Sequence, residues 1–111
     1  WGYKGDLING KKEGQGSFFY QDGRKYIGNF KNDLFNGEGT LFDKTGYTQF
    51  QGSWKEGNYN DGKGYAIYDG KRYEGEFHNG KPNGYGVYSD TLGNVIAKGI
   101  WRNGTLIQMQ K

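Results

Sequence analysis

The sequence predicts an all-β fold: an elongated, single-layer antiparallel sheet of tandem β-hairpins that twists into a ribbon with a groove. Three observations predict it. A five-residue pattern with a central glycine and apolar ends recurs every 23 or 24 residues. Glycine accounts for 22 of the 111 residues, and aromatic residues for 18%. No apolar stripe of helical period runs along the chain, and glycine falls too often for a helix to propagate.

The recurring pattern divides the chain into four and a half copies of one unit. Tyr3, Tyr26, Phe50 and Tyr73 open the complete copies, and Ala97 opens a decayed fifth. A Gly-x-Gly segment and a later turn glycine follow each complete opening. We therefore expect one repeat domain over residues 1–111. Its expected units are residues 3–25, 26–49, 50–72, 73–96 and a partial unit at 97–111.

Each unit is expected to form a hairpin. Its first strand is the opening pattern, in which the first, third and fifth residues share one face. The second and fourth residues, such as Lys4 and Asp6, are mostly polar, so the other face should meet water. The second strand should follow the Gly-x-Gly, as at residues 17–20. Asp22-Gly23 and Asp69-Gly70 predict the connecting turns, because glycine accepts positive φ.

Glycine inside a strand usually weakens it, and we expect it here because aromatic rings lie over it. A ring from one strand can rest flat on a neighbouring glycine, which has no Cβ to collide with. One layer of strands then gains an aromatic core without a second sheet. Two rows of rings and apolar side chains should share this face: Tyr3, Tyr26, Phe50 and Tyr73, then Leu7, Phe30, Trp54, Phe77 and Trp101. Four and a half units would make a ribbon about 45 Å long.

The aromatic face of such a sheet is also its open face. Rings that no second layer covers are expected to stay partly accessible, and a contiguous aromatic surface usually marks binding. The same side chains would then serve as core and as binding surface. The predicted partner-binding residues come from the middle units and are Tyr26, Phe30, Phe50, Trp54, Tyr73 and Phe77.

The pattern Tyr-x-Gly-x-Phe/Trp, followed by Gly and Gly-x-Gly at a 23-residue period, resembles the MORN repeat (membrane occupation and recognition nexus). Residues 73–86 match it best. The resemblance implies a non-catalytic module of the kind found in cytoskeletal and ciliary proteins, junctional adaptors, lipid kinases and a histone methyltransferase. The departures are Asp33, an insertion at Asn60-Asp61, and Ala97. They predict altered turns and a decayed terminal cap.

Several chemical motifs almost appear, and none is complete. Residues 57–63 have the Gly-x₄-Gly-Lys of a phosphate loop, but Gly64 follows where Ser or Thr would hold magnesium. Asn60-Asp61-Gly62 resembles only part of a calcium loop. His78 is the sole histidine, without cysteine nearby. We therefore expect no catalytic residue, no metal site and no cofactor.

Three binding functions remain open. The favoured one is a scaffold whose groove takes a peptide or an amphipathic helix of a protein partner. The first alternative is anionic phospholipid headgroup binding. Its contacts would be Lys11, Lys12, Lys63 and Lys81. The second is glycan binding by a secreted chain, for which Asn103-Gly104-Thr105 would be a glycosylation sequon.

Charge and cysteine content bear on the class of partner and on the cellular compartment. The 15 basic and 12 acidic residues are scattered evenly, so no nucleic-acid partner is expected. The absence of cysteine favours a reducing compartment. We expect a cytoplasmic location, with association to the cytoskeleton, a cilium or a membrane implied by the resemblance, and secretion stays open. Exposed terminal strands would permit end-to-end self-association.

Overall fold

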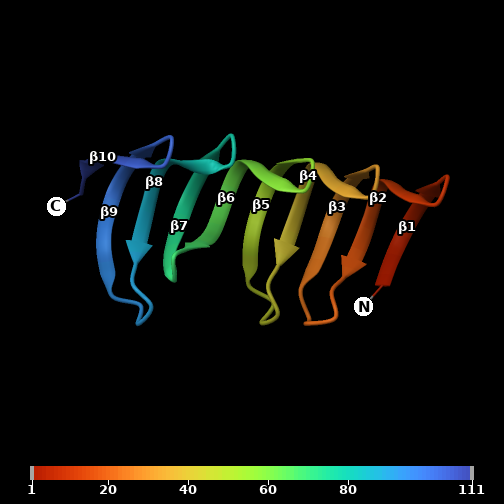
Figure 1. Cartoon of the computed structure of the whole chain (residues 1–111), viewed down its shortest axis with the longest axis horizontal. Coiled ribbons are helices and arrows are strands. Elements are labelled where there is room, and N and C mark those ends of the chain that lie inside the picture. Colours follow the sequence, from red (N-terminus) through yellow and green to blue (C-terminus); the bar gives the residue numbers. More distant parts are fainter. Residues whose placement is uncertain (1, 111) are drawn as a thin grey trace.

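The computed structural model describes residues 2–110 and forms one open sheet of ten antiparallel strands in chain order (Figure 1). The strands are β1 (Gly2–Ile8), β2 (Lys11–Phe19), β3 (Lys25–Lys31), β4 (Leu34–Phe42), β5 (Thr48–Lys55), β6 (Asn58–Tyr68), β7 (Lys71–His78), β8 (Lys81–Ser89), β9 (Val95–Arg102) and β10 (Thr105–Met109). Residues 2–110 contain no helix. The predicted all-β, single-layer sheet of consecutive hairpins is confirmed.

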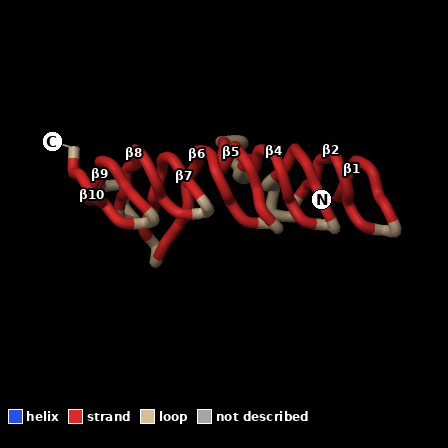
Figure 2. The backbone as a smooth tube through the Cα atoms, turned by 90° about the horizontal axis from the view of Figure 1, so that it is seen from above, coloured by secondary structure: helices blue, strands red, loops and turns tan. Residues whose placement is uncertain are grey.

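The sheet is long and narrow. Its principal extents are 52 × 25 × 18 Å. Seen from above, the backbone winds along the long axis like an open spring (Figure 2), as the right-handed twist of paired strands requires. Each strand pairs only with its neighbours in sequence. The array therefore gains stability one hairpin at a time, through nearest-neighbour packing.

Two-residue turns close the hairpin inside each unit. In the first, Asn9 and Gly10 have φ values of 53° and 79°, as a type I′ turn requires. Asp33 stands where the other turns have glycine, yet it adopts φ 71°. The altered turn expected there is therefore wrong. Aspartate tolerates the left-handed region, and the Asp33 carboxylate accepts a hydrogen bond from the Lys12 backbone N–H at 2.8 Å.

The connections between units lie at the other edge and differ in length. Three span residues 20–24, 43–47 and 90–94, and the fourth is the two-residue turn at Asp69-Gly70. Asp43 organises the second loop, since its Oδ1 accepts the backbone N–H groups of Thr45 and Tyr47 at 3.0 and 3.1 Å. Asp90 plays the same part in the last loop.

Hydrogen bonds join each of the later turns to the unit before it. In the third unit, the N–H of Gly57 donates to the carbonyl of Phe35 at 2.8 Å. The N–H of Glu56 donates to Oδ1 of Asn36 at 3.0 Å. The same paired contacts recur at the turns of the second, fourth and fifth units. The accepting side chains all precede the first glycine of a Gly-x-Gly: Glu13, Asn36, Asp61 and Asn83.

Glycines face one another across neighbouring strands and make room for rings. Gly16 pairs with Gly5 on one side and with Gly28 on the other. A Cβ at Gly16 would lie 2.8 Å from Cε1 of Tyr3, and a Cβ at Gly39 would overlap the ring of Tyr26. The expected ring-over-glycine contact is thus present in the sheet.

The third unit changes the register. In β5 and β6, Gly52 pairs with Gly62 rather than with Gly64, the second glycine of the Gly-x-Gly. On its other side, β6 pairs Gly64 with Gly75 of β7. Within β6, the glycine that pairs with a glycine of β5 is Gly62, and the one that pairs with a glycine of β7 is Gly64. The line of facing glycines therefore shifts by two residues where it crosses β6. The inserted residue is absorbed here, in the strand, so the altered turn expected at Asn60-Asp61 is wrong.

Candidate functional site: the aromatic face

The core lies on one face of the sheet and is made almost entirely of rings. Its buried members are at most 4% exposed: Tyr26, Phe30, Leu41, Phe50, Trp54, Tyr73 and Phe77. In three successive units the first and fifth residues of the opening pattern meet edge to face. The centroid distance is 5.2 Å for Tyr26–Phe30, and the same for the two later pairs. Such pairs contribute about 0.5–1.5 kcal/mol beyond their buried area.

All six predicted partner-binding residues belong to this core. They share one face, as expected, but their expected partial accessibility is wrong. A further ring from the second strand covers the opening residue: Phe35 stacks on Tyr26 with centroids 3.7 Å apart, and Tyr59 stacks on Phe50 at 4.0 Å. Alanine substitutions among the six would therefore report on folding before they report on binding.

Polar ends of the core rings are satisfied by backbone carbonyls. The hydroxyl of Tyr26 donates to the carbonyl of Asn29 at 2.9 Å, and that of Tyr73 to Glu76 at 2.7 Å. Burial raises the pKa of both tyrosines to about 12. The indole Nε1 of Trp54 donates to the carbonyl of Gly39 at 3.1 Å. These bonds fix the rings in place, so the surface above them is built on a rigid floor.

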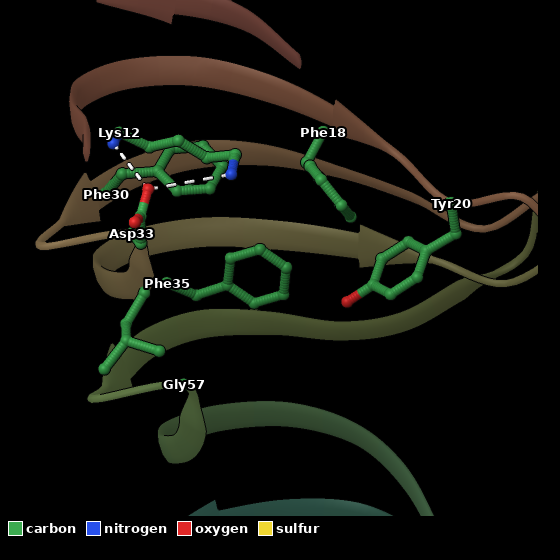
Figure 3. Close-up of a pocket in the computed structure, with 8 residues that line it drawn as sticks. Lys12, Phe18, Tyr20, Phe30, Asp33, Phe35 and Gly57 are labelled. Atoms are coloured by element: carbon green, nitrogen blue, oxygen red, sulfur yellow. Dashed lines mark hydrogen bonds and ion pairs between the residues drawn. The ribbon is translucent and has the colours of Figure 1, made fainter. Parts of the chain in front are cut away.

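A first pocket opens over this floor between the first two units. It has a volume of about 290 Å³. Phe18, Tyr20 and Phe35 line it, with Lys12 at one end (Figure 3). The ammonium of Lys12 lies 3.7 Å from Oδ1 of Asp33, so the charge at this pocket is paired.

A second pocket of about 510 Å³ opens between the fourth and fifth units. The rings of Tyr68, Tyr88 and Trp101 line it, with Pro82 and the core ring Tyr73. Lys81, Asn103 and the turn glycines Gly80 and Gly104 form the rest of its lining. The aromatic face thus carries a pocket near each end of the ribbon.

The four predicted lipid-contacting lysines do not gather on one surface. Lys12 lies over the rings of Tyr3 and Phe18, at 5.4 and 5.2 Å from their centroids. Lys81 lines the second pocket, at the far end of the ribbon. Lys63 lies on the opposite face, in a depression that it shares with Glu74. Lys11 is exposed beside the first turn.

The opposite face carries a polar cluster around Arg72. Its guanidinium stacks on Tyr65, 3.8 Å from the ring centroid, and pairs with Glu74 at 3.1 Å. Tyr65 donates to Oδ2 of Asp43 at 2.6 Å, and Tyr47 donates to Glu74 at 2.6 Å. The hydrogen bonds received, first from the Thr45 hydroxyl and then from Tyr65, lower the pKa of Asp43 to about 2. The cluster ties the loop at residues 43–47 to β6 and β7.

The residues of the incomplete catalytic and metal-binding motifs make structural contacts. His78 Nδ1 lies 2.7 Å from Oδ1 of Asp61, which also accepts the N–H of Asn79. No group of three or more metal-ligating side chains occurs among residues 2–110. Over the same residues, no helix has the length and apolarity needed to cross a membrane.

The family model of the MORN repeat matches residues 3–23, 26–46 and 73–94, more than half of the chain. The chain belongs to the MORN-repeat family. The matches begin at Tyr3, Tyr26 and Tyr73, and they leave out the third unit, where the register changes. MORN repeats form a generally non-catalytic module that is often involved in binding or membrane association. No curated protein matches the chain.

Several accessible rings of the face escaped the sequence-based prediction, although Trp101, which lines the second pocket, was expected on this face. Most lie on the second strand of a unit or in the loop after it, such as Tyr20, Tyr68 and Tyr88. The sequence does contain a signal for rings on the second strand. Phe35 and Tyr59 each follow the fifth residue of an opening pattern by five residues. These alternate positions on the second strand point to the same face as the first-strand rows.

Proposed function

We propose that this MORN array is a non-catalytic interaction module whose aromatic face receives a peptide or amphipathic helix of a protein partner. One observation carries the proposal. Tyr20 in the first pocket and Tyr88 in the second remain partly open to solvent, beside the buried core rings Phe30 and Tyr73 that line the same pockets. Rigid aromatic anchors around a small pocket are where binding energy concentrates in protein interfaces.

The distribution of lysines supports a protein partner over a membrane surface. A bilayer presents its charge in one plane, so the contacting lysines would have to share a face. Here Lys63 lies on the polar face, whereas Lys81 lies at the rim of the aromatic one. Lys12 is already paired with Asp33.

The test is selection of binders from a displayed library of amphipathic peptides, followed by titration of the selected peptide. Tyr20→Ala removes a ring of the first pocket and should weaken binding about tenfold, as truncation of a central aromatic anchor does. Phe19→Ala is the matched control, because Phe19 is the preceding residue and is 38% exposed on the other face. Urea midpoints of both variants show that they fold. Equal effects of the two substitutions would refute the proposal.

A further inference from the structure

The second pocket lies where the fourth unit lacks a ring that the second and third units have. Phe35 pairs with Phe30, and Tyr59 with Trp54, so both occupy the position that stacks on the opening ring. In the fourth unit the same position, paired with Phe77, holds Pro82. The pyrrolidine ring is smaller than a phenyl ring. The space it leaves merges with the gap between Tyr68, Tyr88 and Trp101.

Lys81 is the one charged residue among those that line this pocket. Asn103, Tyr68 and Tyr88 add neutral groups that can donate or accept hydrogen bonds. Among residues 2–110, no aspartate or glutamate lines this pocket, whereas Asp33 pairs with the lysine of the first pocket. A mostly apolar pocket whose one charged lining residue is a lysine complements an apolar group that carries a carboxylate close by.

We propose that this pocket takes one large apolar side chain of the partner segment, with a neighbouring carboxylate of that segment paired to Lys81. The inference rests on the proposed function and specifies the chemistry of its ligand. The volume of about 510 Å³ suits a side chain with its flanking backbone. The carboxylate decides the register in which the segment lies.

The experiment titrates the chain with N-acetyl-leucine, which carries a carboxylate, and with N-acetyl-leucinamide, which does not. Two equivalent indole N–H groups report the site by NMR. Trp101 lines the pocket and donates to Gly86, whereas Trp54 makes the same bond to Gly39 inside the core. We expect the Trp101 signal to shift and saturate while the Trp54 signal stays in place.

The carboxylate should bind about two- to five-fold more tightly than the amide, the range of a solvent-exposed ion pair. Lys81→Gln should remove that difference and leave the amide's affinity unchanged. Tyr68→Ala should abolish the Trp101 shift, while Tyr85→Ala should not. The two side chains are 41% and 43% exposed, and Tyr85 lies on the other face. Equal shifts of the two indoles, or equal affinities of the two probes, would overturn the inference.

Two further measurements distinguish a failure of this inference from a failure of the proposed function. If displayed peptides bind the array and the Trp101 signal stays still, the pocket assignment is wrong and the interaction module stands. Vesicles of phosphatidylcholine with phosphatidylserine form the second arm. If they bind the chain in a Lys81-dependent way and no displayed peptide does, the anionic partner is a lipid, and both proposals are wrong.

Discussion

Replacing Gly39 with alanine tests the contact that gives this single layer its core. Gly39 has no positive φ, so alanine brings no backbone strain. The three atoms nearest to the new Cβ would all belong to the side chain of Tyr26; the hydroxyl oxygen is the closest, and the farthest, Cε1, is at 2.6 Å. That ring is 0% exposed and is stacked against Phe35 at 3.7 Å, so it has no free space into which to move.

The expected cost follows from two contributions. Forcing an extra methyl group into a packed core costs about 1–3 kcal/mol. Displacing Tyr26 from its stacked partner costs about 0.5–1.5 kcal/mol more. We therefore expect the free energy of unfolding to fall by about 1.5–4.5 kcal/mol, a large share of the ~5–15 kcal/mol typical of a domain.

Urea unfolding, followed by tryptophan fluorescence and circular dichroism, measures the change. Gly46→Ala is the control: no heavy atom lies within 4 Å of its Cβ, so its cost is the backbone strain of a φ of 90°, about 1–2 kcal/mol. In a Tyr26→Leu background, Gly39→Ala should lose most of its penalty. The reasoning is refuted if Gly39→Ala costs no more than Gly46→Ala, or if its penalty persists without the ring.

Three further outcomes are expected. Because burial raises the pKa of Tyr26 and Tyr73 to about 12 from an ordinary 10, the folded chain keeps protons that the unfolded chain releases. Stability should be full below pH 10 and decline between pH 10 and 12; urea midpoints across this range check it, and a flat profile would contradict it. Asn36→Ala removes the acceptor of a turn N–H and should cost about 1 kcal/mol, with Asn36→Asp as the conservative control in the same unfolding assay. The pKa of Asp43, about 2, predicts that its stabilising effect is present above pH 4 and lost as the pH falls toward 2. Asp43→Asn should therefore flatten the decline of stability in acid. Asp6→Asn should leave this decline unchanged, because the Asp6 carboxylate makes no hydrogen bond or ion pair within the described residues.

The repeat made the fold predictable because its constraints are local. The spacing of the opening patterns sets the strand order, and Asn-Gly pairs such as Asn79-Gly80 specify two-residue turns. The glycines inside strands predicted rings lying over them, and Gly39 under Tyr26 is such a contact. Each of these features is decided within one hairpin or between adjacent hairpins.

The site was less predictable because exposure depends on what covers a ring. The opening pattern correctly places Trp54 and Phe50 on one face, but it says nothing of the stacked cover that Tyr59 provides. The second pocket lies where Pro82 stands in place of the ring that the second and third units have, and this difference appears only when the strands are paired. The register change in β6 likewise depends on pairing, since the inserted residue lies outside the turn itself.

The two-residue step within β6 shifts the line of facing glycines by roughly 7 Å, at about 3.3 Å per residue. The rings do not separate there: the centroids of Phe50 and Phe77 lie 5.6 Å apart, against 5.5 Å for Tyr26 and Trp54 at the preceding unit boundary. What the array keeps constant from unit to unit is therefore the contact between rings, and a residue inserted in a strand leaves the core continuous.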